Sequence, residues 1–119
     1  MAGQNYRDLV VWQRAMDLAQ AVYDLTRAFP PDERFGLTAQ TRRAAVSIPS
    51  NIAEGQGRGG DAEFVRFLRI AHGSLREVET QLILAMRCGL VGDESVRPIL
   101  ERCAEVGRLL NGLIRSQQS

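Results

Sequence analysis

Apolar residues recur at intervals of three and four along four stretches of this chain, separated by connections rich in glycine, proline or acidic residues. Such spacing gives an α-helix one buried face. No stretch of useful length alternates apolar and polar residues as a strand does. The pattern predicts an all-α, up-down-up-down four-helix bundle in a single domain, residues 1–119, with short flexible tails at 1–5 and 117–119. The predicted helices span residues 8–28, 37–54, 61–88 and 93–116.

The first predicted helix carries two parallel apolar stripes instead of one. One stripe forms a heptad seam suited to a bundle core. The other lies beside it and makes the apolar face wider than one core requires. Exposed apolar surface of this extent usually marks an interface, so we expect the second stripe to mediate self-association. We expect small residues of the second helix to take part in it, namely Ala39, Ala44, Ala45, Ser47, Ser50 and Ala53. The core seam is Val11, Ala15, Leu18, Val22, Leu25 and Phe29, and the second stripe is Trp12, Met16, Ala19, Tyr23 and Thr26.

The second predicted helix contains Pro49 inside its apolar pattern. A proline in a helix interior removes a backbone donor and clashes with the preceding turn, at a cost of ~3 kcal/mol, so we expect a bend there. Asn51, followed three residues later by Glu54, resembles a capping box and predicts that the helix restarts after the bend. The other three helices are expected to be capped by aspartates, namely Asp8, Asp61 and Asp93.

Charge is balanced overall but unevenly distributed. The chain has 15 basic residues, all of them arginine, and 14 acidic residues, which gives a formal charge of +1. This balance excludes a polyanion binder defined by gross basicity. Residues 34–76 hold seven arginines against three acidic residues. Arginine suits bidentate contacts to phosphate or carboxylate, so this basic middle predicts a phosphate-facing surface or one half of a subunit contact.

The sequence offers no catalytic or metal-binding constellation. His72 is the single histidine and has no cysteine or carboxylate cluster at ligand spacing, so no metal site is expected. Cys88 and Cys103 are predicted to lie ~15 Å apart along the helix axes, too far for a disulfide, as separate buried thiols. The glycine-rich run 55–60 lacks the ending of a phosphate loop, which favours a flexible turn. We therefore expect no enzyme and no cofactor, with a small hydrolase or nuclease as the competing class.

Glu54 lies beside an apolar helical face, where an unpaired carboxylate would cost several kcal/mol. It therefore needs a partner. The partner is either a group at the helix end of the same chain or an arginine of a neighbouring subunit, and the sequence leaves both open.

The first residues lack the basic start and apolar core of a signal peptide. No apolar run approaches the ~18 residues of a membrane span. We therefore expect a cytoplasmic protein that does not engage a membrane and whose thiols stay reduced.

Short segments spread over most of the chain together resemble the signature of one protein family. They are Tyr6–Leu9, Val11–Gln13, Val22–Tyr23, Phe29–Pro30, Arg34–Leu37, Gln40, Arg42–Ala45, Ser50–Gly55, Phe67–Leu68, Ala71–Ser74 and Glu77–Leu82. The family comprises small four-helix-bundle proteins encoded by intervening sequences in bacterial 23S ribosomal RNA genes. Related bundles are accessory factors of diversity-generating retroelements, known as accessory variability determinants. The visible departure is the absence of lysine.

The resemblance implies a homo-oligomer in the form of a closed pentameric ring. It also implies RNA or DNA as a partner and a reverse transcriptase as a further one, while the role of the intervening-sequence members is undefined. We expect the interface to consist of Trp12, Met16, Ala19, Tyr23 and Glu54. We expect the nucleic-acid contacts to come from Arg42, Arg43, Arg58, Arg66, Arg69 and Arg76. The alternative is a purely structural or protein–protein scaffold whose arginines pair with acidic neighbours.

Overall fold

The structure is a computed structural model that describes residues 5–118. It contains four long helices: α1 (Val10–Thr26), α2 (Leu37–Gly57), α3 (Asp61–Arg87) and α4 (Asp93–Gln118). Two 3-10 turns, η1 (Tyr6–Asp8) and η2 (Pro31–Glu33), precede α1 and α2.

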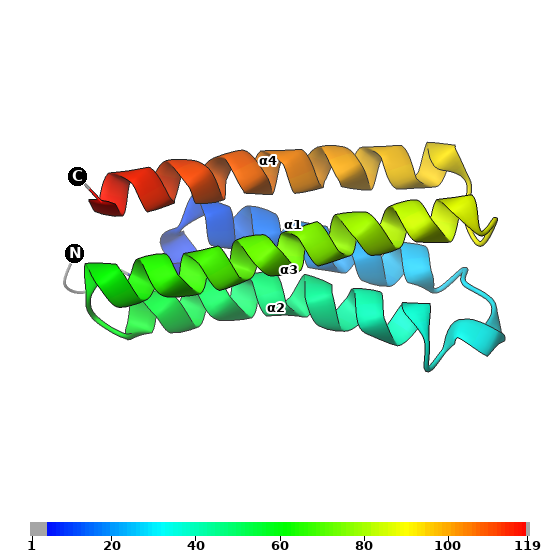
Figure 1. The fold of residues 1–119 in the computed structure, drawn as a ribbon, viewed down its shortest axis with the longest axis horizontal. Helices are drawn as coiled ribbons and strands as arrows, with labels where there is room; N and C mark the ends of the chain where they lie inside the picture. Colours follow the sequence, from blue (N-terminus) through cyan, green and yellow to red (C-terminus); the bar gives the residue numbers. More distant parts are fainter. Residues whose placement is uncertain (1–4, 119) are drawn as a thin grey trace.

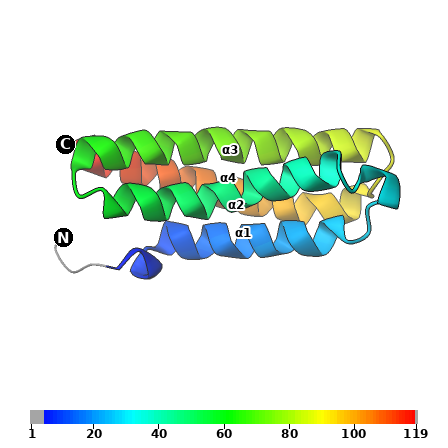
Figure 2. The same ribbon diagram turned by 90° about the horizontal axis from the view of Figure 1, so that it is seen from below.

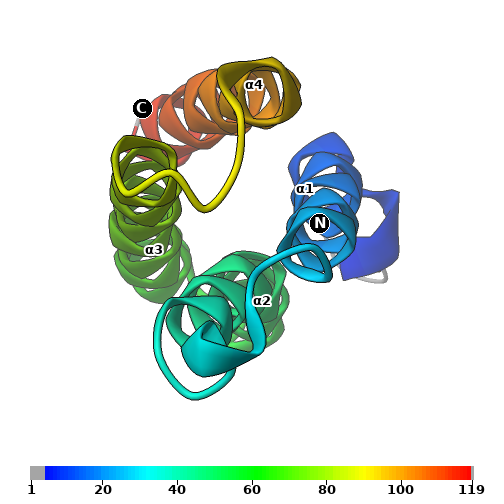
Figure 3. The same ribbon diagram turned by 90° about the vertical axis from the view of Figure 1, so that its right-hand side faces the viewer.

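The four helices run alternately up and down along a body of 46 × 22 × 20 Å (Figure 1). Seen end-on, they occupy the corners of a four-sided bundle (Figure 3). Each helix packs against its neighbours in sequence, and α4 closes the bundle by packing against α1. The described residues contain no strand. The predicted all-α, up-down-up-down bundle is confirmed.

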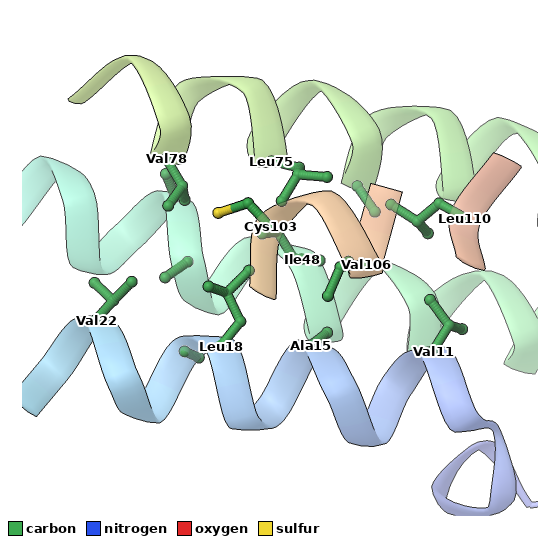
Figure 4. Close-up of a cluster of buried hydrophobic side chains, with 14 of the residues drawn as sticks. Val11, Ala15, Leu18, Val22, Ile48, Leu75, Val78, Cys103, Val106 and Leu110 are labelled. Atoms are coloured by element: carbon green, nitrogen blue, oxygen red, sulfur yellow. The ribbon is translucent and has the colours of Figure 1, made fainter. Parts of the chain in front are cut away.

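The core is formed by the predicted apolar seams, which meet along the bundle axis (Figure 4). Leu18, Leu75 and Leu110, from three different helices, have no solvent exposure. A strict heptad repeat does not hold to the end of α4, where Ile114 is buried and Leu113 is only half-buried. A helix of 3.6 residues per turn drifts from a strict heptad, so the buried stripe moves by one position.

The predicted aspartate caps are wrong. Asp8 belongs to η1, and Leu9 occupies the N-cap position of α1 without a side-chain hydrogen bond. Gly60, whose backbone is extended, is the N-cap residue of α3, so Asp61 is the first residue inside that helix. Asp93 is likewise the first residue of α4. These two carboxylates still lie where the helix dipole favours negative charge.

The chain ends also differ from expectation. Helix α4 continues to Gln118, two residues past its predicted end at 116. Asn5 is ordered by accepting a hydrogen bond from the backbone N of Arg7 at 2.8 Å. The remaining predicted tail positions, 1–4 and 119, lie outside the described residues.

Helix α2 is continuous through Pro49, and its ribbon bends near its middle (Figure 2). Because proline has no N–H, the carbonyl of Ala45 lacks its usual helical donor. The predicted restart at Asn51 is wrong, since the side chain of Asn51 donates backwards to the carbonyl of Ser47 at 2.8 Å and to its hydroxyl at 2.9 Å. Asn51 therefore supports the turn around the proline and does not cap a new helix.

Candidate functional site

An apolar groove of about 530 Å³ runs between α1 and α2. Met16 and Tyr23 on α1 and Val46 on α2 remain 44%, 38% and 42% exposed at this groove. Tyr6 and Trp12 stack edge to face at one end of it, with ring centroids 5.3 Å apart. The lining consists of Tyr6, Trp12, Met16, Asp17, Ala19, Gln20, Tyr23, Val46, Pro49, Ser50 and Ala53.

The groove is where the predicted second stripe of α1 lies. Ala19 is only 7% exposed and belongs to the core cluster as well as to the groove lining. Small side chains, Ala19 with Ser50 and Ala53, contribute little bulk between the larger residues. The fourth predicted interface residue of this stripe, Trp12, is half-buried. The α1 half of this surface was predicted from its stripe, and on α2 the small residues Ser50 and Ala53 were expected there, whereas Val46 and Pro49 were not.

Arg42 joins α2 to α1 beside the groove residue Tyr23. Its Nε donates to the hydroxyl of Thr26 at 2.8 Å, and its Nη2 donates to the carbonyl of Tyr23 at 3.4 Å. Its guanidinium also lies over the Tyr23 ring, 4.6 Å from the centroid. This predicted nucleic-acid residue is therefore engaged in holding two helices together.

Two further predicted arginines share one aromatic ring at the turn between α2 and α3. Arg58 and Arg66 lie 5.1 and 4.5 Å from the centroid of the Phe67 ring. This arrangement needs close helix packing, which Gly55 provides, since a Cβ there would lie 2.5 Å from the Cβ of Phe67. The glycine was predicted as part of a flexible turn, but it is a buried residue inside α2.

Both of these arginines are also ion-paired. Arg58 meets Glu54 at 2.6 Å, and Arg66 meets Glu63 at 3.0 Å. The hydrogen bond from Arg66 lowers the pKa of Glu63, and the same bond raises the pKa of Arg66. Glu54 thus has a partner at the end of its own helix. Of the two partners that the sequence left open, this is the group of the same chain.

The last two helix-α3 arginines of the predicted set differ from each other. Arg76 pairs with Glu79 at 2.6 Å. Arg69 is exposed, and no side chain among residues 5–118 pairs with it. On α2, Arg43 is exposed and equally without a side-chain partner in the described part of the chain. Four of the six predicted arginines are therefore tied to their own chain, and Arg43 and Arg69 are the two that are not.

A polar seam between α2 and α3 was missed by the sequence analysis. The hydroxyls of Ser47 and Ser74 are hydrogen-bonded across the two helices at 2.8 Å. One turn further along, a polar pocket of about 320 Å³ opens to solvent. Its lining is Gln40, Arg43, Ala44, Ser47, Glu77 and Gln81. The polar seam could have been predicted from polar residues that recur at helical spacing on both helices.

The described residues contain no group of three or more His, Cys, Asp and Glu side chains placed to hold a metal ion. Cys88 and Cys103 are both free thiols, but the prediction that both are buried is wrong, because Cys88 is exposed just beyond the end of α3. Burial raises the pKa of Cys103 to about 12, with a further contribution from the nearby Glu79 carboxylate. None of the described helices is both long and apolar enough to cross a bilayer.

Comparison with known proteins identifies a family and a related solved structure. The sequence pattern of the 23S rRNA-intervening sequence protein family matches residues 7–112. A solved structure from Bacteroides thetaiotaomicron, a protein with unknown function from the S23 ribosomal protein family, is similar with a TM-score of 0.79 and 26% sequence identity. That match covers 88% of this chain and 98% of the other. No curated protein matches this sequence significantly.

Proposed function

This chain belongs to the 23S rRNA-intervening sequence protein family, and on that premise we propose that it is a non-enzymatic adaptor that self-associates and contacts nucleic acid. The apolar groove between α1 and α2 takes a second copy of the chain. The arginines of α2 and α3 meet the phosphates of RNA or DNA. A reverse transcriptase, implied by the resemblance of related bundles, is a further candidate partner.

The groove is the single observation that carries this proposal. Met16, Tyr23 and Val46 are each more than a third exposed around one apolar hollow. Aromatic residues and methionine are enriched at the centres of protein interfaces, whereas charged residues are depleted there. Covering an apolar hollow of this kind removes apolar surface from water, which favours binding of a partner there.

The geometry favours a head-to-tail contact between copies. A concave groove needs a convex apolar counterpart, and α3 exposes Ile70 and Leu84 on one side of the helix. Because α2 separates α3 from α1 around the bundle, this counterpart lies away from the groove (Figure 3). A contact between two different patches repeats around a ring or along a filament. The resemblance supplies the number five for a closed ring.

The nucleic-acid part of the proposal rests on Arg43 and Arg69, which have no partner among the described side chains. Exposed ion pairs such as Arg58 with Glu54 are held weakly and can exchange a carboxylate for a phosphate. A ring would repeat these guanidinium groups around its axis and concentrate their field. The alternative scaffold without nucleic acid is favoured by the four arginines that already have partners.

Light scattering of the wild-type protein tests self-association. We expect a multiple of the 13.2 kDa chain mass, and a monomer at micromolar concentration would refute the proposal. Met16→Glu places a charge in the groove and should dissociate the assembly. Val10→Glu is the matched control, because Val10 is also an exposed α1 residue but does not line this groove. If Met16→Glu assembles like the control, the interface lies elsewhere.

Fluorescence anisotropy with labelled structured RNA and duplex DNA tests nucleic-acid binding. Affinity should fall steeply between about 50 and 200 mM salt, because phosphate contacts release counterions. Combined Arg43→Ala and Arg69→Ala should weaken binding and flatten this salt dependence. If no binding occurs even at low salt, the scaffold alternative holds. If binding survives the double substitution unchanged, the arginine surface has been misplaced.

A further inference from the structure

The polar pocket between α2 and α3 has an unusual composition for the space between two bundle helices. Its lining carries a guanidinium, a carboxylate, two carboxamides and a hydroxyl, from Arg43, Glu77, Gln40, Gln81 and Ser47. Bundle helices ordinarily meet through apolar side chains. The core proper continues beneath this pocket through Ala44 and Val78.

The hydrogen-bonding groups of this pocket are largely unused. Arg43 and Glu77 both line it, yet among residues 5–118 neither pairs with the other or with any further side chain. The Oε1 atom of Gln81 is buried without a hydrogen-bond partner. A buried polar atom left without a partner costs free energy, which a bound molecule can recover.

One wall of the pocket is rigid. Ser47 is hydrogen-bonded to Ser74 on α3 at 2.8 Å and accepts from Asn51 at 2.9 Å. The bond between Ser47 and Ser74 therefore links the two helices directly beside the pocket. Arg43 lies one turn from Ser47 on α2, and Glu77 lies one turn from Ser74 on α3. Donors and acceptors are thus presented from two facing helices.

We propose that this pocket binds an unpaired guanine base of RNA, an inference that rests on the nucleic-acid part of the proposed function. Guanine presents two acceptors, O6 and N7, which arginine binds in a bidentate manner. Its neighbouring edge presents two donors, N1–H and the N2 amino group, which a carboxylate accepts. Arg43 takes the acceptors in place of a phosphate, and Glu77 takes the donors. Gln40 and Gln81 supply amide groups on the remaining sides.

The other bases fit this charge pattern less well. Adenine places an acceptor, N1, where guanine has a donor, so it would face the Glu77 carboxylate unfavourably. Cytosine and uracil lack the N7 acceptor of a purine and leave one donor of Arg43 unpaired. Single-stranded loops are also where RNA exposes its base edges to side chains. Arg69, on the exposed side of α3, is available for the phosphate backbone.

Fluorescence anisotropy with short labelled uridine tracts tests this inference. Three uridine oligonucleotides are compared: the first has a central guanine, the second has a central adenine, and the third contains uridine alone. The wild-type protein should bind the guanine tract about tenfold more tightly than the adenine tract, as expected for one bidentate contact. Glu77→Gln should reduce this ratio by about threefold, because a neutral amide offers only one acceptor oxygen to the guanine donors while Arg43 still distinguishes O6 of guanine from the amino group of adenine.

Arg69→Ala is the matched control on the same helix. It should weaken binding of all three tracts by a similar factor and leave the guanine preference unchanged. Glu77 is exposed, so the melting temperature of Glu77→Gln should match that of the wild type, which separates recognition from folding.

The outcomes distinguish this inference from the proposed function. If none of the tracts binds at low salt, and structured RNA and duplex DNA also fail, nucleic-acid contact itself is wrong. If the tracts bind with equal affinity, or if Glu77→Gln keeps the full guanine preference, the pocket is not the reader and only this inference is overturned.

Discussion

Replacing Gly55 with alanine tests how closely α2 and α3 must approach. The added Cβ would lie 2.5 Å from the Cβ of Phe67, 3.2 Å from the Cδ1 of Phe64 and 3.3 Å from the Cγ of Phe67. Carbon atoms pack best at about 3.5–4.0 Å, so the first of these contacts is short by roughly 1 Å. The neighbouring atom is a Cβ attached directly to the backbone, so relief requires movement of a helix and cannot come from a rotamer change.

The expected magnitude follows from two opposing terms. Overpacking of this kind costs about 1–3 kcal/mol, and a clash with a backbone-attached atom belongs at the upper end. Alanine in place of glycine inside a helix returns about 0.5–1 kcal/mol. The net expectation is a loss of about 2 kcal/mol, which corresponds to roughly 8 °C in the melting temperature of a domain of this size.

Gly57→Ala is the matched control for this substitution. Gly57 lies two residues further along α2, its φ is not positive, and a Cβ there meets no atom within 4 Å. The same chemical change should therefore leave stability unchanged or raise it by up to about 1 kcal/mol. Thermal unfolding followed by circular dichroism, at one fixed protein concentration, measures both variants. Equal stability of Gly55→Ala and Gly57→Ala would refute the close-approach argument.

Three further predictions concern an arginine contact, the two thiols and the Glu63 carboxylate. Arg42→Ala should lower the free energy of unfolding by about 1–2 kcal/mol, because it removes hydrogen bonds to α1 and the stack on Tyr23. Arg43→Ala should change it by less than about 0.5 kcal/mol in the same urea titration, and equal effects would contradict the assigned roles. In the native protein a thiol reagent at about pH 8 should modify the exposed Cys88 and spare the buried Cys103, whose pKa of about 12 keeps it protonated. Both thiols should react in denaturant. Fast reaction of both thiols in the native protein would contradict this prediction. The pKa of Glu63 is lowered from 4.5 in the folded state, so its pairing with Arg66 stabilises the fold above pH 4.5, and this stabilisation is lost as the pH falls through the lowered pKa. The urea midpoints of the wild type and Glu63→Gln should therefore differ less in acid than at neutral pH. A difference that grew in acid would contradict this sign.

The helices and their core were predictable because hydrophobic spacing is a local property. Leu18 and Val22 are fully buried, as the seam of the first helix predicted. Helix caps were less predictable, since a cap depends on the backbone conformation that precedes it. The 3-10 turn at Tyr6–Asp8 includes the predicted cap, and the extended backbone at Gly60 takes the place expected for Asp61.

The candidate site was predicted in part. The exposed stripe of α1 was visible from spacing, but the contribution of Val46 and Pro49 from α2 depended on which helices are neighbours. The partners of the arginines could be predicted only in part. Contacts at spacings of three and four, such as Arg58 with Glu54, can be read from a helix. The contact of Arg42 with Thr26 links residues sixteen positions apart and follows only from the packing of α2 on α1.

An even number of antiparallel helices has a practical consequence for how this protein can be joined to others. The start of α1 and the end of α4 lie at the same end of the bundle, together with the turn between α2 and α3 (Figure 1). A label or a second protein fused at either terminus would therefore be held on one side. The opposite end, with the connections around η2 and Gly89, would stay free for attachment to a surface, a grid or a tether.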